Sequence, residues 1–102
     1  MAIADQATLA DVAKTYADAI REEGSARQLW ASSHSDYFEL WLVTEPIDAD
    51  VERQLYTAEL ILYERFPEAS LSVHVLNPRY FGDSDPAEMI PRDAEEVQLR
   101  PA

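Results

Sequence analysis

The residues of this chain that could do chemistry are a few carboxylates and two histidines. Asp36 precedes the apolar run at residues 37–44, and Glu39 lies inside it. Carboxylates hold divalent cations or act as general acids and bases. His34 lies in the polar turn before this run, and His74 lies in a second apolar run at residues 71–76. His34 and Asp36 could join a metal site. We favour a structural interpretation instead, in which His34 is an exposed turn residue and His74 is a hydrogen-bonded histidine on a strand face.

Three further acids follow the first apolar run, namely Glu45, Asp48 and Asp50. Ligands of α/β proteins often bind beyond the carboxyl ends of strands, so these acids are candidates for a site. The same positions are those that the start of a helix prefers for capping and for pairing with the helix dipole. We favour capping, with Asp48 as the N-cap.

Hydrophobic periodicity predicts the elements that position these residues. Thr8 and Asp11 form a capping box, and Gly24 is predicted to end the first helix in a left-handed conformation. Pro67 closes the second helix. The predicted elements are a helix from residue 8 to Gly24, strands at 27–31 and 37–44, a helix at 50–66 and a strand at 71–76.

The order α-β-β-α-β predicts a single α/β (α+β) domain over residues 1–102, with a small mixed sheet covered by helices on one face. Residues 79–102 are predicted to be a loop and C-terminal segment. Weak alternation at 95–100 fits either a short edge strand or an ordered tail.

Residues 29–32 (Leu-Trp-Ala-Ser) and 35–40 (Ser-Asp-Tyr-Phe-Glu-Leu) resemble the minimal nucleotidyltransferase (DNA polymerase beta-like) domain. In that family a strand ends in a Gly-Ser pair, and two aspartates one residue apart lie on the next strand. A third aspartate follows on the strand after the next helix. The resemblance covers roughly residues 9–78 in element order, and it implies a site for magnesium and a nucleoside triphosphate.

This sequence departs from the family pattern at most of those positions. Ala31 stands where the glycine belongs, and the aspartate pair falls at Tyr37 and Glu39. The third aspartate falls near His74, with no acid in residues 71–77. A phenol does not replace a carboxylate as a magnesium ligand, and one glutamate does not hold two ions. The resemblance therefore implies a degenerate, inactive metal site. If the enzymatic alternative holds, Glu39 and Asp36 are its catalytic candidates, with magnesium and a nucleoside triphosphate as cofactors.

Net charge and composition limit the classes of molecule that this chain is expected to bind. The net charge of −12, from 20 acidic and 8 basic residues, repels nucleic acids and anionic membranes and suits a basic protein partner. The chain has no cysteine, which excludes disulfides and thiolate metal sites. No apolar run approaches the length of a membrane span, and the first residues lack a basic segment followed by an apolar stretch, so we expect a cytoplasmic protein.

Two sets of residues, each containing two aromatic side chains, are candidates for contact with a partner. Tyr56, Leu60 and Tyr63 form a second apolar sector on the second predicted helix, which predicts a homodimer if nothing else in the chain covers them. The second set, in the loop after the last predicted strand, is Arg79, Tyr80 and Phe81. Folding back over the sheet edge and binding a partner are equally compatible with this patch. The sequence favours a non-catalytic, acidic protein-interaction or regulatory module of antitoxin-like type without cofactors. The alternative is a divergent nucleotidyltransferase-like enzyme or nucleotide-binding protein.

Overall fold

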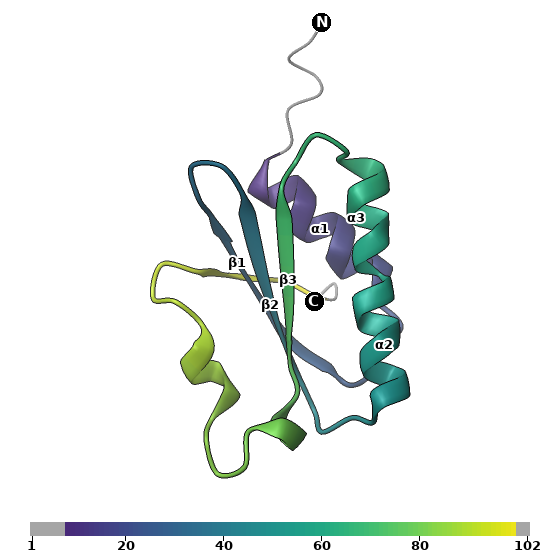
Figure 1. Cartoon of the computed structure of the whole chain (residues 1–102), viewed down its shortest axis with the longest axis vertical. Helices are drawn as coiled ribbons and strands as arrows, with labels where there is room; N and C mark the ends of the chain where they lie inside the picture. The colour runs from purple at the N-terminus through teal and green to yellow at the C-terminus, as the bar shows by residue number, and fades with distance from the viewer. Residues whose placement is uncertain (1–7, 100–102) are drawn as a thin grey trace, which may run out of the picture.

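The computed structural model describes residues 8–99. Figure 1 shows a twisted sheet with helices on one side and an irregular segment on the other. The elements are α1 (Leu9–Ala19), β1 (Ala26–Ser33), β2 (Phe38–Thr44), α2 (Ala49–Thr57), α3 (Glu59–Arg65), β3 (Leu71–Leu76), the 3-10 turns η2 (Pro78–Tyr80) and η3 (Pro86–Met89), and β4 (Glu95–Val97). The predicted α/β (α+β) class and α-β-β-α-β order are confirmed.

The four strands lie in the order β3-β2-β1-β4. β1 and β2 form an antiparallel hairpin, and β4 pairs antiparallel with the other side of β1. β2 and β3 are parallel, because the α2–α3 helices carry the chain back between them. The sheet is therefore mixed, as predicted.

The main core lies between the sheet and its helices. Alternate strand residues such as Leu29, Leu40 and Leu42 face this core, where they meet Tyr16 of α1 and Leu62 of α3. The Tyr16 hydroxyl donates a 3.0 Å hydrogen bond to the Leu55 carbonyl, which ties α1 to the end of α2. Burial raises the pKa of Tyr16 far above its ordinary value.

Two helix predictions were wrong in detail. α1 begins as predicted, with the Thr8 hydroxyl accepting from the Asp11 amide, but it ends at Ala19 rather than at Gly24. Gly24 is not left-handed, since only Gly82 has a positive φ among the described glycines. The predicted helix at 50–66 is broken at Ala58 into α2 and α3. The expected Asp48 N-cap is present, with its carboxylate accepting from the Val51 amide at 3.0 Å.

The opposite face of the sheet is crossed by residues 77–94, which we call the crossover segment. It leaves β3 at one edge of the sheet and reaches β4 at the other edge, on the side away from the helices (Figure 1). Trp41 projects to this side and is only 5% exposed, so the predicted burial of this side chain is confirmed. Within residues 8–99 no helix has both the length and the apolar character needed to cross a membrane. Residues 1–7 and 100–102, which belong to the predicted domain and C-terminal segment, lie outside the described residues.

Candidate functional site

Glu39 lies between the two histidines of the chain. The Nε2–H of His34 donates to Oε1 of Glu39 at 3.0 Å, and the Nε2–H of His74 donates to Oε2 at 2.8 Å. All three side chains are partly exposed to solvent, with Glu39 the most buried of them. Both carboxylate oxygens are therefore engaged by imidazoles.

Strand pairing explains how residues so far apart in the sequence meet. In the parallel register of β2 and β3, Glu39 lies opposite Ser72 and Trp41 lies opposite His74. Because side chains alternate along a strand, Glu39, Trp41 and His74 share the face away from the helices. The His74 ring stacks on Trp41 with ring centroids 5.6 Å apart.

The β1–β2 turn supplies the other histidine. The His34 amide donates to the Tyr37 carbonyl at 2.8 Å, which closes the turn. The His34 ring stacks on Tyr37 with centroids 4.2 Å apart and the planes 16° from parallel. This ring is thus fixed against the turn while its Nε2 points to Glu39. His34 lies in the turn as predicted, but it is half-buried rather than exposed, and its ring bonds Glu39.

The structure does not place Asp36 with Glu39. Asp36 is exposed in the turn and lines a surface depression of about 1050 Å³, which Glu39 does not line. Glu39 and His74 do meet, at the positions where the nucleotidyltransferase resemblance puts its second and third carboxylates. At the third of these positions the chain has the imidazole of His74 instead of a carboxylate, and this imidazole is hydrogen-bonded to Glu39. Among residues 8–99 no group of three or more His, Asp or Glu side chains is arranged to hold a metal ion.

The tyrosines of the α2–α3 surface have a structural role that the sequence did not suggest. The Tyr56 hydroxyl accepts from the Val75 amide at 3.3 Å, and the Tyr63 hydroxyl lies 3.3 Å from the Leu71 carbonyl. Both bonds cover the outer edge of β3. The three predicted residues are nevertheless exposed together, and Leu60, between the two tyrosines, is the most exposed at 58%.

The Tyr63 hydroxyl also donates a 2.7 Å hydrogen bond to Glu59. This bond to a carboxylate raises the pKa of Tyr63 to about 12, since loss of the proton would place two negative charges together.

Asn77 fixes the start of the crossover segment, and sequence reasoning missed it. Its side chain is 1% exposed. Oδ1 accepts from the amides of Ile47 and Arg79 at 3.2 and 3.1 Å, and Nδ2 donates to the Ile47 carbonyl at 3.0 Å and to Glu52 at 3.3 Å. One signal was available: Asn77 is the only asparagine in the chain, and it stands before a proline at the end of a strand.

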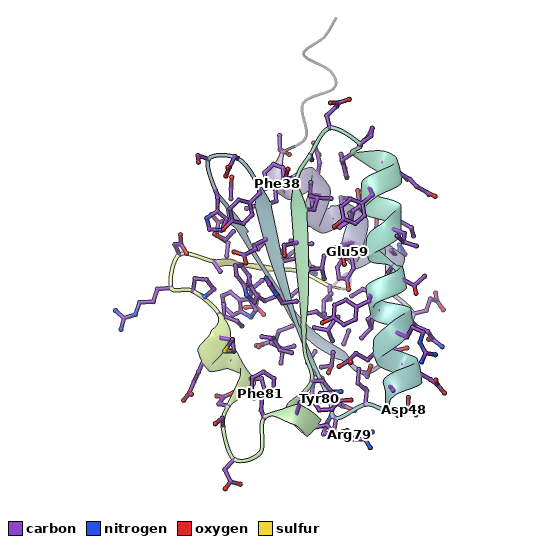
Figure 2. All side chains as sticks on the ribbon, in the orientation of Figure 1. Phe38, Asp48, Glu59, Arg79, Tyr80 and Phe81 are labelled. Carbon is purple, nitrogen blue, oxygen red and sulfur yellow. The ribbon has the colours of Figure 1, made fainter. Side chains whose placement is uncertain are left out.

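The three residues of the predicted patch, Arg79, Tyr80 and Phe81, differ in exposure and in contacts. Tyr80 is 63% exposed, whereas Phe81 is half-buried. The Arg79 guanidinium lies 3.5 Å from the Ile47 carbonyl, so it packs on the β2–α2 loop. All three residues lie at the start of the crossover segment, as Figure 2 shows.

The crossover segment carries a second exposed apolar side chain and several free acids. Met89 in η3 is 60% exposed. Of the acids, Asp83, Glu88 and Asp93 are exposed and form no ion pair with any residue in the 8–99 range. Sequence reasoning missed Met89 because it lies in a stretch without hydrophobic periodicity.

Comparison of the chain with protein-family models, with curated proteins and with solved structures gives no match.

Proposed function

We propose that this chain is a non-catalytic, cytoplasmic protein-interaction module that binds a basic polypeptide through its crossover segment. The observation that carries the proposal is the pairing of large exposed apolar side chains with free acids on one segment. Tyr80 and Met89 expose about three fifths of their surface there. Aromatic and methionine side chains are enriched at the centres of protein interfaces.

The charge of the segment specifies the kind of partner. The crossover segment, residues 77–94, has four carboxylates and two arginines. One of the four, Asp85, caps η3 by accepting from the Ala87 amide. The others lack ion pairs in the described part of the chain, so their charge is available to an incoming lysine or arginine. Complementary charge accelerates association and rejects acidic competitors.

The non-catalytic part of the proposal is supported by the state of Glu39. A carboxylate that serves as a general base needs a free lone pair directed at its substrate. Both oxygens of Glu39 accept hydrogen bonds from imidazoles instead. The arrangement suits a structural cluster that joins β2, β3 and the β1–β2 turn.

Capture of partners from an extract of the native host tests the proposal. The wild-type chain should retain a basic protein that elutes as salt is raised. The double variant Tyr80→Ala/Met89→Ala should lose at least about 1–2 kcal/mol of binding free energy, as hot-spot truncations do. Ile61→Ala is a control, because Ile61 is an exposed apolar side chain of α3, outside the crossover segment. Retention that is insensitive to the double variant, or an acidic partner, would contradict the proposal.

A further inference from the structure

The two edge strands of the sheet, β3 and β4, differ in what contacts the backbone on their outer sides. At β3 the Tyr56 hydroxyl accepts from the Val75 amide, and the Tyr63 side chain lies over the Leu71 carbonyl with its hydroxyl 3.3 Å away. At the other edge, β4 pairs with β1 on one side only, and no strand of residues 8–99 lies on its outer side. An edge strand with free N–H and C=O groups is a template for another strand. The molecule therefore has one covered edge and one open edge.

A groove of about 870 Å³ runs beside the open edge, between α1 and the C-terminal strand. On the α1 side its floor contains the buried Ala13 and Ala17, whose side chains are small, and its wall also contains the charged residues Lys14, Asp18 and Arg21. On the other side lie Val97 and Leu99, which are only half-buried. A strand added next to β4 would direct every second side chain into this groove.

The charges at the edge favour a basic strand over a second copy of this chain. Glu95 and Glu96 in β4 are exposed and form no ion pair within the described range. Glu95 lies opposite Ala31 in the register, on the helix side, and Glu96 lies opposite Trp30 on the other side. Two β4 strands placed side by side would bring these like charges together, between chains that each carry a net charge of −12.

We infer that the outer edge of β4 accepts an extended segment of a basic protein partner as a fifth strand. Apolar side chains of that segment enter the groove beside Val97 and Leu99, and its lysines or arginines lie next to Glu95 and Glu96. This is recognition by strand addition, in which the backbone provides affinity and alternate side chains provide specificity. The inference rests on the proposed function, because it names the shape of the basic partner and a contact adjoining the crossover segment.

A short acetylated peptide in which valine alternates with lysine and arginine is a suitable probe. We expect it to slow hydrogen exchange of the outward-facing β4 amides, those not bonded to β1, by about tenfold or more when bound, and to leave the β3 amides unchanged. A control peptide with the same composition, but with its valines grouped at one end, should not slow the β4 amides. It separates strand addition from attraction between charges alone.

Two variants locate the contact. Glu95→Gln/Glu96→Gln should weaken binding of the alternating peptide, whereas Glu88→Gln/Asp93→Gln removes the same charge from the crossover segment and should weaken it less. Ala17→Leu fills the groove without a change of charge and should abolish the β4 protection. Thermal unfolding shows whether this variant remains folded. If it does not, Ala10→Leu, at the groove's exposed margin, narrows it without a change of charge.

Equal β4 protection by both peptides would overturn the inference, as would failure of the alternating peptide to bind. Peptide binding that shifts only signals of the crossover segment would also overturn it, while leaving the proposed function in place. Outward-facing amides of β4 that are already protected in the free protein would show that this edge is occupied, and would overturn the inference as well. Loss of the Tyr80 and Met89 effect with β4 protection intact would count against the proposed function alone.

Discussion

Replacement of Asn77 by alanine is the most informative single perturbation of this fold. The side chain makes four hydrogen bonds, two of them to the amide and the carbonyl of Ile47. Ile47 is itself buried, so water does not readily replace the lost partners. Leaving a buried polar group unsatisfied costs about 1–3 kcal/mol. The loss of both Ile47 partners, offset in part by the Arg79 guanidinium 3.5 Å from the carbonyl and by relaxation of the loop, leads us to expect a loss of about 3 kcal/mol in the free energy of unfolding.

Urea unfolding monitored by tryptophan fluorescence and circular dichroism measures this loss. With a slope of about 1.5 kcal/mol per molar urea, the midpoint should fall by about 2 M. Glu52→Gln is the matched control, because its amide oxygen still accepts from Asn77 Nδ2, and its midpoint should stay near the wild-type value. An Asn77→Ala midpoint within about 0.5 M of the wild type would refute the reasoning. It would mean that the Ile47 groups reach water and that Asn77 does not hold this corner.

Four further predictions concern other parts of the molecule. Leu60→Glu should weaken a homodimer that tightens with added salt, and a wild-type monomer in sedimentation at high protein and salt concentrations would rule the dimer out. Trp41→Ala should cost about 3–5 kcal/mol of unfolding free energy, as truncation of a buried aromatic does, and a small change in denaturation midpoint would contradict this. Magnesium with nucleoside triphosphates should neither raise the melting temperature nor be turned over, and turnover abolished by Glu39→Ala would establish the enzymatic alternative. Stability should fall as pH rises from about 10 to 12, because the unfolded chain loses its tyrosine protons near pH 10 while the Glu59 hydrogen bond holds the pKa of Tyr63 at about 12. Tyr63→Phe should show a smaller loss over that range.

The sequence predicted the elements whose side-chain periodicity directly reflects burial. Strands at 37–44 and 71–76 and the Asp48 cap were found because apolar runs and capping residues are local signals. The end of α1 was not found, since it is set by tertiary structure. Ile20 is buried just after the helix, and Ala26 already pairs with Thr44, so the residues between them are needed for the turn.

The break between α2 and α3 was missed for a similar reason. Nothing in residues 50–66 interrupts the helical period, but the Leu55 carbonyl accepts a hydrogen bond from Tyr16, 39 residues away. A side chain that bonds a helical carbonyl can interrupt the regular ladder. Only the packing of α1 reveals this contact.

From the sequence Glu39 was paired with Asp36, and His34 and His74 were interpreted as structural residues, so the cluster that these histidines form with Glu39 was not predicted as a site. Glu39, His34 and His74 were all singled out, yet their contacts depend on the β2–β3 register and on the turn between β1 and β2. Pairing over 35 residues leaves no local trace in the sequence. The open β4 edge was equally inaccessible, because strand order is a property of the assembled sheet.

The three-residue length of β4 has a consequence for the order in which the protein assembles. The β1–β2 hairpin closes a short loop, whereas β4 joins β1 only after the whole intervening chain has been placed. Short-range pairing is fast, and closing longer loops costs more entropy. We therefore expect β4 and the crossover segment to dock last in refolding and to detach first in native-state fluctuations. In that partly open form most of the helix-side core stays packed while Trp41 and its strand neighbour Trp30 meet water, so tryptophan fluorescence would report an intermediate before the global unfolding transition.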